Sequence, residues 1–148
     1  MKILACLTSY GKSLLNFISN IFVGRSINNW SVHYSNSKPF EKPFHTYKKI
    51  TNPKNRYFAD PFVFSHKGDT VCFVEDYDIP NRRGHITAIR LMADNYEILG
   101  TVLKKNYHLS FPYVFSFENE IFMVPESNEA KKVVLYRCVE FPMLWEED

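Results

Sequence analysis

Acidic side chains stand at the ends of apolar, strand-like segments, and their types and positions suit them to chemistry. Asp60 lies directly before one apolar segment, and Glu75 and Asp76 close the next. Glu126 closes a further segment in the same way. Carboxylates that meet at the rim of a β-sheet protein can act as general acid and general base. The alternative is that Asp60 only caps the turn before Pro61 by accepting backbone N–H bonds.

Three polar residues near these acids are candidates for binding a ligand. His108 can act as a base, bind sugar hydroxyl groups, or be a hydrogen-bonded core histidine. Ser110 follows no nucleophile-elbow pattern and has no His–acid pattern nearby, which excludes a serine hydrolase. Arg83, in an Arg-Arg-Gly turn, is either solvated or paired with Glu75 or Asp76.

The closely spaced acids Glu75, Asp76 and Asp78 also fit a hard-metal site, because such cations take oxygen ligands. A plain acidic turn before Pro80 explains the same residues and is the better interpretation. We therefore predict no metal and no cofactor.

An internal repeat predicts the strands on which these residues lie. The echoed segments are 60–65 with 111–116, 71–76 with 121–126, and 85–90 with 132–137. Pro61 is matched by Pro112, 51 positions later, and Asp76 by Glu126, 50 positions later. Short strands that recur with a period of about 40–50 residues are typical of β-propeller blades.

The repeat predicts an all-β fold with about two blades. Residues 62–103 form one four-stranded antiparallel meander, while the second unit, from Tyr113, ends after three strands and is incomplete. Propellers need about four blades or more to close. The sequence therefore predicts a partial propeller, completed either by a longer product or by partner chains, including further copies of this one.

Composition excludes several classes of protein. With 45% hydrophobic and 23% charged residues, the 148-residue chain is an ordinary globular one. The formal net charge of +2 and the absence of an RNA-binding signature argue against nucleic acid, despite a basic cluster at 48–56. Cys6, Cys72 and Cys138 show neither zinc spacing nor a disulfide framework, so a reducing, cytoplasmic location is expected.

The N-terminal region predicts an amphipathic helix, because the apolar residues of 12–23 recur at helical spacing. This stretch lacks the roughly 18 apolar residues that a membrane span needs. The expected organisation is an N-terminal helical segment at 1–27, a first strand and extended connection at 28–57, and the two blades at 58–148.

A series of short motifs also resembles one known family. The motifs are Phe58-Ala59-Asp60-Pro61-Phe62-Val63, Phe73-Val74-Glu75-Asp76, Gly84-His85-Ile86, His108-Leu109-Ser110-Phe111-Pro112, Met123-Val124-Pro125-Glu126-Ser127, Leu135-Tyr136-Arg137 and Phe141-Pro142-Met143-Leu144-Trp145. Their order across residues 30–145 resembles the N-terminal propeller domain of the bacterial and plant glucosamine inositolphosphorylceramide transferase type. That domain is similar in turn to five-bladed propeller glycosidases of the arabinanase and β-xylosidase type.

This resemblance implies roles for two carboxylates. The glycosidases use an Asp in a similar Asp-Pro context of the first blade as catalytic base, which falls on Asp60. Glu126 is the candidate for a second catalytic carboxyl, although the blades that carry the family's other acids lie outside this chain. Two carboxylates flanking a glycosidic bond are the minimum for hydrolysis, and wider separation implies inversion.

The resulting prediction is a partial five-bladed, glycosidase-like propeller that binds a carbohydrate or glycoconjugate and is inactive alone. Asp60 and Glu126 are its candidate catalytic residues. Its candidate binding residues are Glu75, Asp76, His108, Ser110 and Arg83. Tyr57, Phe58 or Tyr113 would offer a ring face to sugar C–H groups.

Two alternatives remain open. The domain can be a glycoside hydrolase or a glycosyltransferase accessory once further blades complete it. It can also be a scaffold that binds protein, with the N-terminal helix and its residues Phe17 and Ile21 as the docking element.

Overall fold

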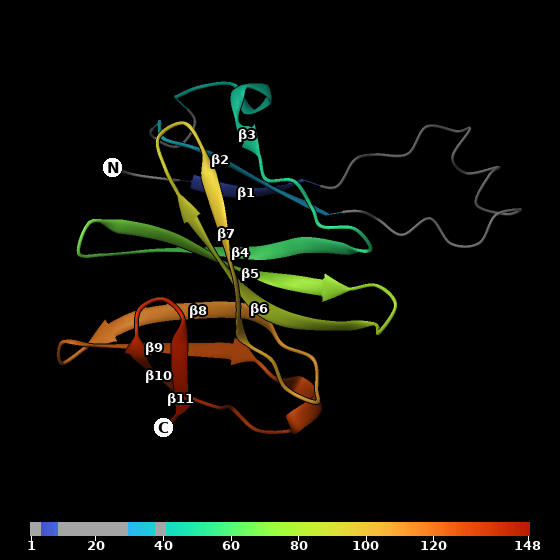
Figure 1. The fold of residues 1–148 in the computed structure, drawn as a ribbon, viewed down its shortest axis with the longest axis vertical. Coiled ribbons are helices and arrows are strands. Elements are labelled where there is room, and N and C mark those ends of the chain that lie inside the picture. The colour runs from blue at the N-terminus through green and yellow to red at the C-terminus, as the bar shows by residue number, and fades with distance from the viewer. Residues whose placement is uncertain (1–3, 9–29, 38–40) are drawn as a thin grey trace, which may run out of the picture.

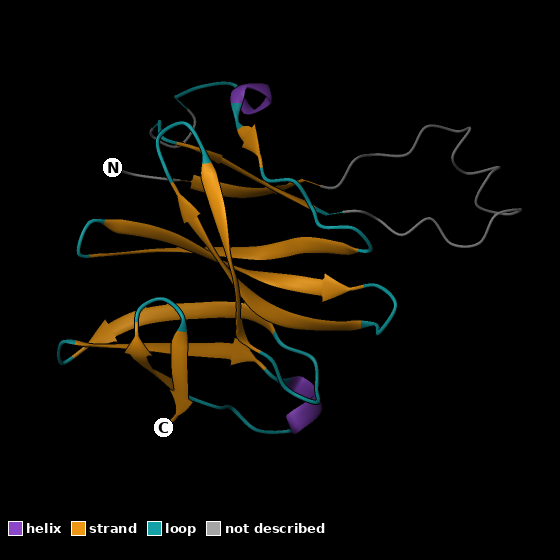
Figure 2. Cartoon of the chain, in the orientation of Figure 1, coloured by secondary structure: helices purple, strands orange, loops and turns teal. Residues whose placement is uncertain are grey.

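The computed structural model describes residues 4–8, 30–37 and 41–148, and for 4–8 it describes the backbone alone. The helix expected within 1–27 lies outside the described residues. In the described part, strands dominate, and the only helices are two short 3-10 turns (Figure 2). The all-β prediction with antiparallel sheets is therefore confirmed for this part of the chain. None of the described helices is long and apolar enough to cross a membrane.

Three antiparallel sheets make up the described fold. We call them the N-terminal sheet (order β1-β2-β3), the central sheet (β4-β5-β6-β7) and the C-terminal sheet (β11-β10-β9-β8). Figure 1 shows the central sheet between the other two. The strands are β1 Leu4–Thr8, β2 Ser31–Ser35, β3 Lys48–Lys49, β4 Arg56–His66, β5 Asp69–Asp78, β6 Arg83–Leu91, β7 Tyr96–Leu103, β8 Ser110–Phe117, β9 Glu120–Glu126, β10 Tyr136–Glu140 and β11 Leu144–Glu147, and the 3-10 turns are η1 Phe44–Thr46 and η2 Asn128–Ala130.

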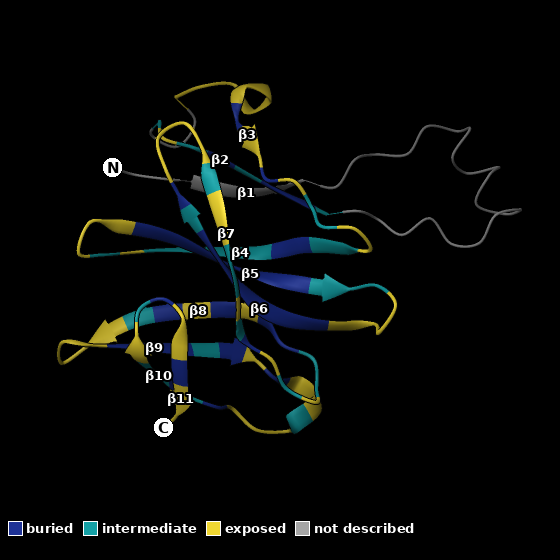
Figure 3. Ribbon diagram, in the orientation of Figure 1, coloured by how far each residue is buried: buried dark blue, intermediate teal, exposed yellow. Residues whose placement is uncertain are grey.

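The central sheet is buried on both faces because β5 is apolar on both. Successive side chains of a strand point to opposite faces. Phe73 therefore joins the core against the C-terminal sheet, which includes Met123 and Trp145. Cys72 and Val74 join the core on the other face, against the N-terminal sheet. Figure 3 shows this burial as dark strands in the middle of the molecule.

A bulge interrupts the first strand of each four-stranded sheet at the repeated X-Pro pair. In β4, Asp60 and Pro61 together oppose one residue of β5, and in β8, Phe111 and Pro112 do the same opposite β9. Asp60 and Phe111 both have positive φ, 46° and 45°. Proline fits such a bulge because it has no backbone N–H to donate to the ladder.

Asp60 therefore lies inside β4, whereas the sequence predicted a position directly before the strand. The ladder resumes beyond the bulge, where Arg56–Ala59 pairs with Glu75–Asp78. The acids thus stand on paired strands, and their side-chain directions follow from the register.

The bulges also correct the alignment of the repeat. Ala59 pairs with Glu75, and Ser110 pairs with Glu126, each just before its bulge. The equivalent of Glu126 is therefore Glu75, at an offset of 51, and not Asp76 at an offset of 50.

The C-terminal sheet has four strands, and not the three predicted for the second unit. A hairpin after β10 adds β11, which pairs Cys138 with Trp145. The Trp145 indole N–H donates to the Pro142 carbonyl at 2.8 Å, and its ring packs at 5.7 Å from that of Phe73. Burial of this large ring explains why the short last segment forms a strand.

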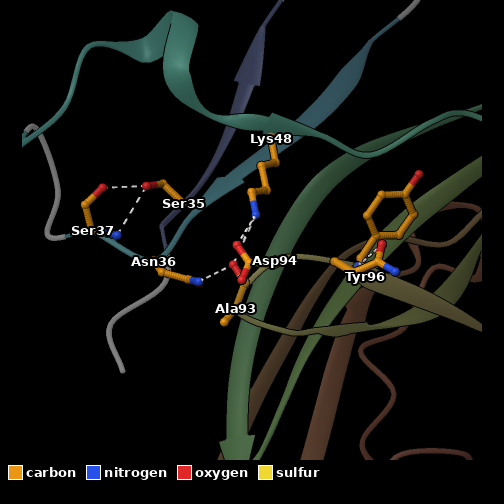
Figure 4. A network of polar contacts seen from close by, with 8 residues as sticks. Ser35, Asn36, Ser37, Lys48, Ala93, Asp94 and Tyr96 are labelled. Carbon is orange, nitrogen blue, oxygen red and sulfur yellow. Dashed lines mark hydrogen bonds and ion pairs between the residues drawn. The ribbon is translucent and has the colours of Figure 1, made fainter.

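Polar contacts join the N-terminal sheet to the β6–β7 turn of the central sheet (Figure 4). Lys48 Nζ lies 2.9 Å from Asp94 Oδ1, and the Asn36 amide donates to the Ala93 carbonyl at 2.6 Å. Both contacts are exposed, so each contributes little to stability. They set the position of the N-terminal sheet, while the apolar contacts of Ile50 and Val32 supply most of its attachment.

Candidate functional site

Three carboxyl groups gather where the central and C-terminal sheets meet. Asp60 and Glu75 come from paired strands, and each side chain shifts the pKa of the other. The charge of Glu126, from β9, acts on both of them. The strand register explains why these carboxyl groups lie close together. The Glu75 side chain points toward the C-terminal sheet, and its repeat equivalent, Glu126, lies in that sheet.

The loop before β8 docks onto the start of β6 beside this cluster. The Gly84 N–H donates to His108 Nδ1 at 2.9 Å, and the Leu109 N–H donates to the Gly84 carbonyl at 3.0 Å. His108 Nε2 then lies 3.3 Å from Glu75 Oε1. A Cβ on residue 84 would lie 2.5 Å from the Leu109 carbonyl oxygen and 2.7 Å from Glu75 Oε1. Only glycine permits this close approach.

Glu126 is the exposed member of the cluster. The buried Ser110 hydroxyl donates to its Oε2 at 3.3 Å. Glu126 also lines an open groove of about 530 Å³ together with Lys131 and Lys132. The groove gives this carboxylate access to a ligand from solvent.

Aromatic rings flank the carboxyl cluster. Tyr57 and Tyr77, paired across β4 and β5, stack with centroids 4.9 Å apart, and the His108 ring lies 6.0 Å from Tyr77. Burial, with the charges of Glu75 and Asp60, raises the pKa of Tyr57 to about 12. The shift agrees with a ring that adjoins the two acids, and the pair forms a wall of ring faces next to them.

Burial and mutual repulsion raise the pKa values of two acids of the site, Glu75 and Asp60. Burial, the hydrogen bond with Asp60 and the charges of Asp60, Glu126 and Asp76 raise the pKa of Glu75 to about 8. Burial and the Glu126 charge also raise the pKa of Asp60, while hydrogen bonds from Glu75 and the Phe111 N–H oppose the rise. Carboxyl groups with raised pKa values in a partly buried cluster are typical of functional sites.

We expect the stability of the protein to fall as pH rises because of Glu75. Its folded-state pKa is raised from 4.5 to about 8, so the folded protein keeps a proton that the unfolded chain releases. The stabilisation is complete below about pH 4.5 and is lost as pH approaches 8. Urea unfolding should show a decline of about 3–4 kcal/mol between pH 5 and 8 that is missing in Glu75→Gln. Parallel curves for the two proteins would contradict this prediction.

Asp76 belongs to a different environment, on the opposite face of β5. Its Oδ2 accepts a hydrogen bond from the Thr87 hydroxyl at 2.9 Å and lies 3.1 Å from Arg56 Nη2 and 3.4 Å from His85 Nε2. Its buried Oδ1 has no hydrogen-bond partner within the described structure. Asp76 therefore faces the N-terminal sheet and is separated from Glu75 by the strand itself.

Other candidates also lie apart from the cluster. Arg83 is exposed at the start of β6, and in the described ranges no ion pair joins it to Glu75 or Asp76. Phe58 is fully buried in the core against the N-terminal sheet, so its ring cannot face a sugar. Asp78 binds the Asn81 N–H and side-chain amide, as expected for an acidic turn. Tyr113 is 56% exposed on β8.

Three residues that contact the candidate site residues were not predicted from the sequence. Gly84 was assigned to a turn, yet it forms both backbone contacts with the His108 loop. Arg56 was assigned to a solvated basic cluster, yet it pairs with Asp76. Tyr77 was not considered, although its position two residues after Glu75 puts both on one face of the strand. That spacing is the one signal that could have found it.

These observations define an all-β protein of stacked antiparallel sheets with a carboxyl cluster and an aromatic wall between two of them. The chain belongs to the family "Glucosamine inositolphosphorylceramide transferase 1, N-terminal", whose model matches residues 13–148.

Plant proteins show the same relationship. The chain is 37% identical over 142 residues to glucosamine inositolphosphorylceramide transferase 1 of Oryza sativa subsp. indica, across 92% of this chain and 18% of that protein. The protein of the same name from Arabidopsis thaliana is 39% identical over 117 residues, across 75% of this chain and 15% of its own length. The chain thus spans less than a fifth of these relatives. No solved structure matches it.

Proposed function

We propose that this chain is part of a glycosidase-like propeller that binds a carbohydrate or glycoconjugate at Asp60, Glu75 and Glu126. The observation that carries this proposal is the cluster of Asp60, Glu75 and Glu126 carboxyl groups beside the stacked rings of Tyr57 and Tyr77. Carboxylates fix sugar hydroxyl groups, and ring faces pack against sugar C–H groups. The name of the relatives, a glucosamine inositolphosphorylceramide transferase, supports a ligand of this class.

The propeller architecture is supported by how the sheets contact each other. The first strand of the central sheet, β4, lies against β8 on one side and against β1 and β2 on the other. First strands that meet in this way are expected around a propeller axis. Phe111 and Phe117 of β8 are 61% and 60% exposed, which supports a further sheet or a partner chain packing beside the C-terminal sheet.

Within this proposal Asp60 is the general base that activates water, and Glu126 is the second carboxyl of the site. The Phe111 N–H lowers the pKa of Asp60 against the raising effect of burial, and Glu126 accepts a hydrogen bond from the Ser110 hydroxyl. With two sheets of the repeat present, the chain binds sugar and leaves hydrolysis or an accessory role in glycosyl transfer to the completed propeller.

Binding to defined sugars tests this function. We expect glucosamine, or arabinose and xylose oligosaccharides, to shift amide NMR signals of the carboxyl cluster in a saturable way. Asp60→Ala and Glu126→Ala should each weaken binding by about 10–100-fold, because a hydrogen bond to a charged group is removed. Glu120→Ala is the matched control, since this acid stands at the opposite end of the same strand as Glu126.

Other outcomes separate the alternatives. Release of a fluorophore from arabinosides or xylosides, abolished by Asp60→Asn, would favour the hydrolase. No response to any of these sugars, with association to a protein partner lost in Phe17→Asp or Ile21→Asp, would favour the scaffold.

A further inference from the structure

A polar pocket lies between the N-terminal sheet and the β6–β7 turn of the central sheet, where Figure 4 shows the polar contacts. Its volume is about 440 Å³, which falls in the range of small-molecule sites. Its lining includes Ser35 of β2, Lys48 of β3 and Asp94 of the turn. None of the residues that line it belongs to the carboxyl cluster, so this pocket is a separate feature of the fold.

The pocket wall contains a buried hydroxyl group that is unpaired within the described structure. Tyr34 lines the pocket and is 1% exposed, and no described residue forms a hydrogen bond with its hydroxyl oxygen. Its side chain is directed into the pocket, because Tyr34 pairs with Lys48 across β2 and β3 and cross-strand partners share a face. Lys48 Nζ in turn reaches Asp94 Oδ1 at 2.9 Å. An unpaired buried hydroxyl is costly, so a molecule that supplies its partner is stabilised there.

The segment at the end of β2 supplies further hydrogen-bonding capacity. Ser35 and Ser37 are joined through their hydroxyl oxygens, and the Ser37 N–H donates to Ser35 Oγ at 3.2 Å. One hydrogen bond between two hydroxyl groups uses only one of their two hydrogens, so the other can still donate. The Asn36 side-chain nitrogen donates to the Ala93 carbonyl, which leaves the Asn36 amide oxygen as an acceptor. The pocket therefore offers both donors and acceptors.

The charges of the pocket favour a neutral ligand. Glu41 and Asp94 are the acids that line it, and Lys42 and Lys48 are the bases, so the formal charges cancel. Lys48 is already paired with Asp94 and also donates to the Ala93 carbonyl at 3.2 Å. A strongly charged ligand would find no excess of opposite charge, whereas hydroxyl groups would find matching donors and acceptors.

We propose that this pocket binds a small neutral polyol of the monosaccharide class, with one ligand hydroxyl group paired with Tyr34. Every hydroxyl group of a polyol both donates and accepts, which suits a wall that carries both kinds of group. The neighbouring Tyr96 ring lies edge-on to Tyr34 at 6.4 Å, but its hydroxyl already accepts the Thr51 N–H at 2.9 Å. Of these two tyrosines, Tyr34 is therefore the one whose hydroxyl is available to a ligand.

NMR titration of the whole chain with glucose tests the proposal. The amide signals of residues 35–37 and 93–94 should shift in a saturable way. They should do so equally in Asp60→Ala, which removes a carboxyl group of the proposed carbohydrate site, so the two sites can fail separately. Glucose 6-phosphate should bind no more tightly than glucose. Shifts that stay linear up to ~50 mM glucose, as expected if only water fills the pocket, or tighter binding of the phosphate would overturn the proposal.

A matched pair of tyrosine variants separates ligand binding from packing. Tyr34→Phe removes an unpaired hydroxyl, so it should weaken glucose binding by about 3–10-fold without lowering the urea midpoint. Tyr96→Phe removes the acceptor of the Thr51 N–H, so it should lower the urea midpoint slightly and leave glucose binding unchanged. Equal glucose affinity of Tyr34→Phe and the unsubstituted protein would overturn the proposal.

Discussion

Replacing Gly84 with alanine is expected to lower the free energy of unfolding by about 2–4 kcal/mol. The new methyl group would overlap the Leu109 carbonyl oxygen at 2.5 Å and Glu75 Oε1 at 2.7 Å. Overpacking of this kind costs about 1–3 kcal/mol, and displacing the His108 loop adds the loss of about one hydrogen bond. The methyl group meets backbone, which cannot rotate away as a flexible side chain would.

Urea unfolding followed by tryptophan fluorescence measures this effect, with Gly68→Ala as the control. Gly68 has a positive φ of 91° but nothing within 4 Å of an added Cβ, so its substitution reports backbone strain alone. We expect about 1 kcal/mol there. An equal or larger loss in Gly68→Ala would show that the close approach at Gly84 is unimportant. The His108 ring signals should also move in Gly84→Ala and stay unchanged in the control.

Truncating Phe73 to alanine should cost about 3–5 kcal/mol, the range for a fully buried aromatic side chain. Phe73 is inaccessible to solvent, and its ring meets those of Trp145 at 5.7 Å and Phe141 at 6.2 Å. It lies in the core that joins the central and C-terminal sheets. Its removal therefore weakens the contact that also brings Glu75 and Glu126 together.

The matched control is Phe117→Ala, because Phe117 is a strand phenylalanine that is 60% exposed. Its removal should change the free energy of unfolding by no more than about 0.5 kcal/mol. Similar losses for the two variants would contradict the packing described between the sheets. The proposed sugar binding should weaken in Phe73→Ala only to the extent that the fold is lost.

Much of the architecture could be predicted from local patterns. The continuous apolar run at 71–74 is typical of a strand buried on both faces, whereas the bulge at Asp60-Pro61 was not predicted, because the sequence placed Asp60 before the strand. The alternation of side chains along a strand and the backbone limits of proline act within a few residues. They can therefore be recognised without knowledge of the fold. The last strand was missed because its stability comes from Trp145 packing on Phe73, which is distant in sequence.

The candidate site was predicted in part, because register decides which face a side chain takes. A shift of one residue sends every side chain of a strand to the opposite face. The sequence alignment matched Glu126 with Asp76, whereas the two bulges match it with Glu75. Asp60, Glu75, His108, Ser110 and Glu126 consequently meet between two sheets, while Asp76 points to the third.

The sequence by itself determined the all-β class and the repeated units, because these depend on short-range periodicity and turn chemistry. Only the tertiary structure decided which carboxyl groups come together, which loop contacts Gly84, and that the Trp145 ring packs in the core. Those features depend on contacts between residues far apart in the chain, such as Gly84 with His108, and on burial that only the packed sheets create.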